Sequence, residues 1–274
     1  MLTGSLLTVA GARIAQFTKT NENSLAESLL RLASGRRVNQ PSEGVGDFFH
    51  SERMNTQYRS NLALLQGIGE GRAFVDVAVA AGERVFNGVQ TMKELVERYY
   101  HSTTTDDDRT AIAAEFNALK TTMTTCISST TYDGLQVVSD NGGTPFRSVS
   151  IDANDLSQRI EISFDSGDIA DVTALELGVT DEATETAAVD AELGKAGSYL
   201  AKTSAYMRGL NAHYNLTTVK ATQAAESAER AVEADTGEEM VQSINKSIRN
   251  QSSMAMMAQA NLFRGSVLML LGIQ

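Results

Sequence analysis

The sequence predicts a mainly α-helical protein of long antiparallel helices, with a terminal coiled coil and a small β-hairpin insertion. Its 274 residues include only two prolines, Pro41 and Pro145, so long stretches contain no residue that breaks a helix. Apolar residues near both ends recur every three or four positions, which is the spacing of one helix face. Partial alternation with a period of two is confined to residues 146–164, where it predicts short strands.

The first predicted helix runs from about residue 2 to residue 32. One face of it is formed by Leu7, Ala10, Ile14, Phe17, Asn21, Leu25, Leu29 and Leu32. Ser34-Gly35 and Pro41 then mark a break, because glycine commonly ends helices and proline cannot continue one. A second helix is expected over residues 42–100, with Ser42 as its N-cap. Glycines are costly inside a helix, so this one needs tertiary support and close packing against Gly67, Gly69, Gly71, Gly82 and Gly88.

The middle of the chain carries the predicted β element, at about residues 132–180. A third helix is expected to begin at Asp106 or Asp107. Tyr132-Asp133-Gly134 then marks a turn before a short strand over residues 135–138, and Asn141-Gly142-Gly143 is another turn signal. This part of the chain is therefore expected to form small hairpins, not a large sheet.

Helix is predicted again after an acidic cap or exposed loop at residues 181–186. One helix is expected over residues 187–233 and the last over residues 238–271. The last helix carries a second stripe at helical spacing, made by Met240, Ile244, Ile248, Gln251, Ala255, Ala258, Leu262 and Met269. A coiled-coil stripe needs a partner, which the other end of the chain or a second copy can supply. We therefore expect a self-assembling subunit, and an intramolecular helical bundle accounts for the same pattern about equally well.

Cysteine and histidine usage does not support a catalytic or metal site. Cys126 is the single cysteine, so no intrachain disulfide can form, and we interpret it as a packing residue. His50, His101 and His213 are isolated, without metal-ligand spacing. The glycines at residues 67–71 lie within a predicted helix, where they give only weak support for a phosphate loop. The sequence therefore predicts a protein that is not an enzyme, with no catalytic residue, no metal and no cofactor.

The net charge of −11 is confined to one window of the sequence. Residues 151–193 contain twelve acidic residues and one basic residue, Arg159, whereas the remaining residues contain 22 of each. This distribution predicts a solvated acidic face and argues against nucleic-acid binding. No uninterrupted run of about eighteen apolar residues occurs, so no membrane association is predicted. No basic residue precedes the apolar run at the N-terminus, so we expect that any export proceeds without a cleaved signal peptide.

Several local sequences resemble those of a known family. They are LLRLASGRRVN at residues 29–39, SERM at 51–54, YDGL at 132–135, IEISFD at 160–165, AESAERAVEADTGEEM at 225–240 and MAQAN at 257–261. In this order they resemble the sequences of bacterial flagellins. The segment SEGVGD at residues 42–47 departs from the family's usual sequence after the first corner. The large variable outer domains of many flagellins are missing, so the resemblance is to a minimal flagellin.

The resemblance implies a structural subunit that self-assembles into the extracellular filament of the bacterial flagellum and serves motility. It implies an inner terminal coiled-coil domain of residues 1–42 and 233–274, and an outer helical domain of residues 43–232. Subunit packing is then expected at Leu7, Ile14, Phe17, Leu25, Leu29, Leu32, Ile244, Ile248, Met254, Ala258 and Leu262. The corner that joins the two domains is expected to use Arg36, Arg37, Asn39 and Glu239.

The partners that the resemblance implies are further copies of the same chain in a helical homopolymer, an export chaperone, the filament cap and the hook-junction proteins. Two other functions remain open at this stage. A hook–filament junction protein shares much of the N-terminal corner and assembles only as a short ring. A signalling coiled coil would need heptads sustained through the middle of the chain, where the predicted strands lie.

Overall fold

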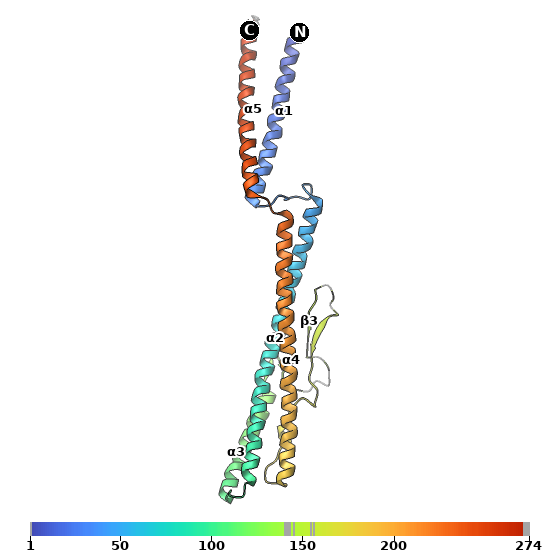
Figure 1. The fold of residues 1–274 in the computed structure, drawn as a ribbon, viewed down its shortest axis with the longest axis vertical. Coiled ribbons are helices and arrows are strands. Elements are labelled where there is room, and N and C mark those ends of the chain that lie inside the picture. The colour runs from blue at the N-terminus through green and yellow to red at the C-terminus, as the bar shows by residue number, and fades with distance from the viewer. Residues whose placement is uncertain (1, 140–143, 145, 154, 156, 271–274) are drawn as a thin grey trace. The chain divides into compact units, whose positions relative to one another are not determined.

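The computed structural model describes residues 2–139, 144, 146–153, 155 and 157–270, with side chains at the two ends described for residues 11–263 and 266. The described chain is mainly α-helical (Figure 1), as the sequence predicts. Its elements are α1 (Leu2–Ser34), α2 (Val45–Tyr100), α3 (Asp106–Ser129), β1 (Thr131–Tyr132), β2 (Leu135–Gln136), β3 (Arg147–Ser150), β4 (Arg159–Ile162), a short 3-10 helix (Val172–Ala174), α4 (Glu182–Val232) and α5 (Thr236–Leu270).

The chain divides into two compact units. The terminal unit consists of Met1–Thr56 and Ala224–Gln274, and the central unit consists of Gln57–Gln223. Helices α2 and α4 contribute to both units. The domain boundaries expected from the sequence, after residues 42 and 232, stay a prediction.

Two helix starts differ from the sequence-based expectation. Helix α2 begins at Val45, so Ser42 lies in the preceding turn and is not its N-cap. That turn forms because the Glu43 carboxylate accepts hydrogen bonds from the backbone N–H groups of Asn39 and Gln40. Helix α4 begins at Glu182, five residues earlier than expected, because the Asp181 carboxylate accepts from Thr184 and caps the first turn.

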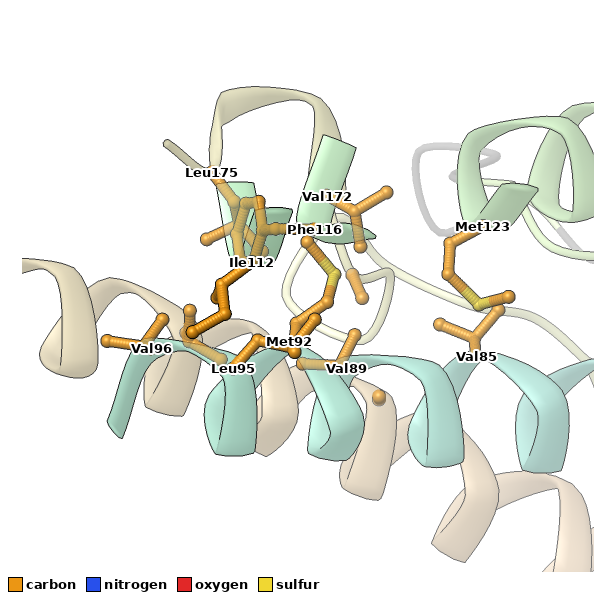
Figure 2. Close-up of a cluster of buried hydrophobic side chains, with 13 residues drawn as sticks. Val85, Val89, Met92, Leu95, Val96, Ile112, Phe116, Met123, Val172 and Leu175 are labelled. Atoms are coloured by element: carbon orange, nitrogen blue, oxygen red, sulfur yellow. The ribbon is translucent and has the colours of Figure 1, made fainter. Parts of the chain in front are cut away.

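One hydrophobic core of the central unit joins α2, α3, the 3-10 helix and α4. Figure 2 shows Val85, Val89 and Met92 of α2 pointing toward Phe116 and Met123 of α3. Complete burial of such a side chain stabilises the fold by about 1.5–3 kcal/mol. The start of α3 is fixed by a capping box between Thr105 and Asp108, which agrees with the start expected at Asp106.

A second hydrophobic core lies where α2 and α4 meet the two hairpins. It is built from Ile68, Phe74, Val75, Ala78, Ala81, Val137, Val138, Val149, Ile162, Phe164, Tyr199 and Leu210. Strands β1 and β2 are joined by Asp133 and Gly134, both with positive φ, as in the tight turn expected there. Strand β2 ends at Gln136, two residues short of the expected strand, and the turn signal at residues 141–143 lies outside the described residues. Strands β3 and β4 pair antiparallel from Arg147↔Ile162 to Ser150↔Arg159.

Candidate assembly interface

Within the terminal unit, α1 and α5 lie side by side (Figure 1). The residues that lose exposure between them are mostly polar. On α1 they include Thr18 and Ser28, which are buried, and Ile14, Asn21, Leu25 and Leu32, which are half-buried. On α5 they include Glu239, Ser243 and Ser253, which are buried, and Lys246 and Asn250, which are half-buried. We call this contact the polar seam.

Ser28 is the centre of the polar seam, with 0% of its surface exposed. Its hydroxyl donates to Glu239 Oε2 at 3.0 Å, and Lys246 Nζ donates to Ser28 Oγ at 2.6 Å. Arg31 Nη1 lies 3.5 Å from Glu239 Oε1. Buried polar groups cost free energy when they lack partners, so this network favours one register of α1 against α5.

Most of the large apolar side chains described on α1 and α5 are exposed in the single chain. They are Phe17, Leu29, Leu30, Met240, Val241, Ile244, Ile248, Met254, Met256, Leu262 and Phe263, and we call them the exposed apolar set. Successive residues of an α-helix are about 100° apart, so those on α5 form two adjacent rows. Met240, Ile244, Ile248, Met254 and Leu262 form the first row, and Val241, Met256 and Phe263 form the second. The second row lies away from the side of α5 that faces α1, and Met254 of the first row borders that side.

The expected subunit-packing residues divide between these two surfaces. Ile14, Leu25 and Leu32 are half-buried on the polar seam. Phe17, Leu29, Ile244, Ile248, Met254, Ala258 and Leu262 are exposed, with Phe17 at 69% and Leu262 at 72%. Leu7 lies in α1, but its side chain is outside the described residues. The apolar stripe of the last helix therefore exists, but it is not the side that contacts α1, and its burial between subunits stays a prediction.

A short antiparallel bridge closes the corner between the helices of the terminal unit. Arg36 pairs with Glu233, the Arg37 N–H donates to the Val232 carbonyl at 2.6 Å, and the Ala234 N–H donates to the Gly35 carbonyl at 3.0 Å. Gly35 has φ +67°, a conformation that favours glycine at the end of a helix. The bridge holds together the two segments that follow α1 and α4.

Side chains reinforce this corner. Arg37 Nη2 lies 2.8 Å from Asp47 Oδ2 and also donates to the Ala231 carbonyl. Asn39 Nδ2 donates to the Arg36 carbonyl. Hydrogen bonds from the backbone, first from Asn39, lower the pKa of the Glu43 carboxyl against the opposing effect of burial. All four expected corner residues, including Glu239, lie in the terminal unit, and whether they join two domains stays a prediction.

Sequence reasoning missed three residues that complete these networks, namely Ser28, Lys246 and Glu43. Ser28 lies three residues after Leu25 and four before Leu32, so the helical spacing places it on the same face. A serine on a helix face that also carries Leu25 and Leu32 was the feature of the sequence that could have identified Ser28. Within the described residues, no group of three or more side chains is arranged to hold a metal ion. None of the helices in the described part of the chain has the length and hydrophobicity needed to cross a bilayer.

The chain is similar to flagellar proteins over almost its whole length. The family described as "Bacterial flagellin N-terminal helical region" matches residues 9–142. A flagellin of Halalkalibacterium halodurans is 28% identical over 264 residues, which cover 92% of this chain and 93% of that protein. A flagellin of Listeria innocua is 24% identical over 273 residues, covering 92% and 94%. A flagellar filament 33 kDa core protein of Treponema phagedenis is 28% identical over 287 residues, covering 95% and 97%.

The family match covers the first helical region, and the relatives extend the similarity through the C-terminal helices. The relatives that match almost the whole chain are bacterial flagellins and a flagellar filament core protein. Flagellins are structural proteins of the flagellar filament, in which they form a homopolymer. The chain spans more than nine-tenths of each relative named here, which agrees with a compact flagellin.

Proposed function

We propose that this flagellin is the structural subunit of a bacterial flagellar filament and assembles through the exposed apolar set. The observation that carries the proposal is that α1 and α5 cover each other mostly with polar side chains and leave the exposed apolar set in solvent. Complete burial of one such side chain contributes about 1.5–3 kcal/mol, so several buried together offset the entropy lost on association. A contact between different surfaces of successive copies propagates a helical polymer when its rotation does not close a ring.

In the proposed filament, residues 1–42 and 233–274 form the inner coiled-coil domain and residues 43–232 the outer domain. Leu7, Ile14, Phe17, Leu25, Leu29, Leu32, Ile244, Ile248, Met254, Ala258 and Leu262 take part in subunit packing. Arg36, Arg37, Asn39 and Glu239 act at the corner between the domains. The exposure of seven of the packing residues supports this assignment, because exposed apolar side chains are available to a neighbouring copy.

The proposal predicts that charge placed on the first row abolishes assembly. We expect the Ile244→Asp/Ile248→Asp variant to form no filaments after a precipitating salt is added, because two carboxylates would have to be buried in an apolar contact. Wild-type protein should form long filaments under the same conditions. Negative-stain electron microscopy and sedimentation of the polymer measure both outcomes.

Gln16→Glu is the control, because it adds a carboxylate to the terminal helices at an exposed polar position of α1 that is turned about 100° away from Phe17. It should retain filaments. Filaments from the Ile244→Asp/Ile248→Asp variant would contradict the assigned surface. Short rings from the wild-type chain would instead favour a hook–filament junction protein, and no polymer would favour a signalling coiled coil.

We also infer that the assembled protein is extracellular and reaches the filament without loss of a signal peptide. Its partners on that route would be an export chaperone, the filament cap and the hook-junction proteins, as the similarity to flagellins suggests. The intact mass of protein sheared from the cell surface tests the export route, because a cleaved leader would lower the mass. Cross-linking of the secreted chain during filament growth tests the three partners.

A further inference from the structure

Among the described side chains of helix α5, three methionines are exposed. Met240, Met254 and Met256 have 55%, 48% and 52% of their surface exposed. Met92 and Met123 lie instead in the core of the central unit (Figure 2). A thioether reacts with peroxides according to its exposure, so the chain contains a reactive and a protected set of methionines.

The three exposed methionines lie on the surface that the proposed filament buries. By the helical spacing Met240 lies about 40° from Ile244 on one side and about 40° from Met254 on the other, whereas Met256 projects about 160° away from Met254. Met256 belongs to the second row with Val241 and Phe263. A methionine in such a row contributes a flexible apolar side chain that adapts to an irregular contact.

We propose that Met240, Met254 and Met256 are separate oxidation sites on α5, and that their oxidation by hydrogen peroxide blocks the self-association of this flagellin. The inference rests on the proposed function. A lone pair of the thioether sulfur attacks one oxygen of the peroxide, and a sulfur–oxygen bond forms as the oxygen–oxygen bond breaks. The sulfur loses two electrons and becomes a sulfoxide, while the other oxygen takes the proton of the transferred oxygen and leaves as water.

The sulfoxide changes the chemistry of the exposed apolar set. Its oxygen is a hydrogen-bond acceptor, and it has no donor when it is pressed against the apolar side chains of a neighbouring copy. The free chain is therefore the sensitive form, whereas assembly covers the same sulfur atoms and protects them. Oxidation is reversible, since a methionine sulfoxide reductase with a dithiol returns two electrons and releases the oxygen as water.

The test measures how much polymer the wild-type protein and its methionine variants form, with and without peroxide treatment of the free chain. Peptide mass spectrometry should find sulfoxide at Met240, Met254 and Met256 before Met92 and Met123. Oxidised wild-type protein should form about ten-fold less polymer than untreated protein, because three polar groups enter an apolar contact. Treatment with the two methionine sulfoxide reductases should restore the polymer. Preformed filaments should resist oxidation at these three positions.

A Met240→Leu/Met254→Leu/Met256→Leu variant removes the sulfur atoms and keeps apolar side chains of similar volume. Its treated and untreated samples should polymerise to the same extent as each other, whereas Met257→Leu should stay as sensitive as wild type. Met257 is the matched control because it is half-buried on the side of α5 that faces α1.

Normal polymerisation of wild-type protein oxidised at all three positions would overturn the inference, as would equal peroxide sensitivity of the triple variant. Absence of polymer from untreated wild-type protein would overturn the proposed function and the assembly part of this inference together. The order of oxidation in the free chain is measured independently of polymerisation, and earlier oxidation of Met92 and Met123 would overturn the oxidation site itself.

Discussion

Glu185 shows how one side chain holds a loop against the start of a helix. Its buried carboxylate accepts hydrogen bonds from the N–H groups of Gly178, Val179 and Thr180, at 2.9–3.0 Å. Gly178 has φ +78°, and a Cβ added there would collide with the Tyr99 hydroxyl, so only glycine fits this turn. Burial raises the pKa of the Glu185 carboxyl, but the three N–H donors together outweigh burial, and the pKa is lowered.

The lowered pKa of Glu185 makes the stability of the central unit depend on pH. The folded-state pKa lies below the ordinary value of 4.5, so the stabilisation is present above that pH and is lost as the pH falls through the folded-state pKa. We expect Glu185→Gln to lower the free energy of unfolding by about 2 kcal/mol at pH 7 and by much less at pH 3. Urea unfolding at the two pH values measures the difference.

Glu182→Gln is the control for this experiment, because it removes the same charge from the same helical turn at an exposed position. It should behave as wild type does. An equal loss of stability at pH 7 and pH 3 in Glu185→Gln would show that the ionised carboxylate is not the cause.

The glycines of α2 show which contacts could be predicted from the sequence and which could not. Close packing at glycines of α2 was expected, and Gly71, Gly82 and Gly88 do lie where a Cβ would collide with a neighbouring side chain. Gly67 and Gly69 have no such neighbour. The sequence could not separate these two groups, because helical spacing tells which residues share a face but not which element covers it.

At the scale of elements, helical spacing likewise did not tell which face of α5 contacts α1. The stripe from Met240 to Leu262 was predictable from its spacing, and α5 forms as expected. Its partner was not predictable, because α1 contacts the neighbouring face that carries Glu239, Ser243 and Lys246. A serine at the seam is easily interpreted as a tolerated surface residue, and only the fold shows that Ser28 bridges a carboxylate and an ammonium group.

The polar seam predicts a stabilising role for one hydroxyl. Ser28→Ala removes the group that donates to Glu239 and accepts from Lys246, which leaves two charged side chains short of a partner. We expect a loss of about 1–3 kcal/mol per subunit. This corresponds to a fall of about 5 °C in the melting temperature of the terminal unit in the free chain, measured by circular dichroism. Thr20→Ala should leave that temperature unchanged, because Thr20 is exposed and bonds only to its own helix. An unchanged temperature for Ser28→Ala would exclude this role.

For the whole molecule, the two units differ in what stabilises them. The central unit contains both hydrophobic cores, whereas the terminal unit pairs its helices through the polar seam and leaves the exposed apolar set in solvent. Burial of apolar surface is the main stabilising contribution in most domains. The sequence indicated apolar helical stripes without a partner at both ends. It could not show that the terminal unit is held by polar contacts and the central unit by apolar cores, because that depends on which helix faces meet.

This difference in stabilisation between the two units predicts the order in which a protease cuts the free chain. Chymotrypsin cleaves after large apolar and aromatic residues, and it needs a locally unfolded segment. We expect cleavage near Phe17 and Phe263 first, because these residues are exposed on helices that only the polar seam holds together. A fragment that contains residues 57–223 should persist, since Phe74 and Phe116 are buried in the two cores. Mass spectrometry of the fragments identifies the cuts. Earlier cleavage within residues 57–223 of the free chain would contradict this order. In assembled filaments, burial of the exposed apolar set should protect the terminal sites, so equal cleavage of free and assembled protein at Phe17 and Phe263 would contradict the assembly surface.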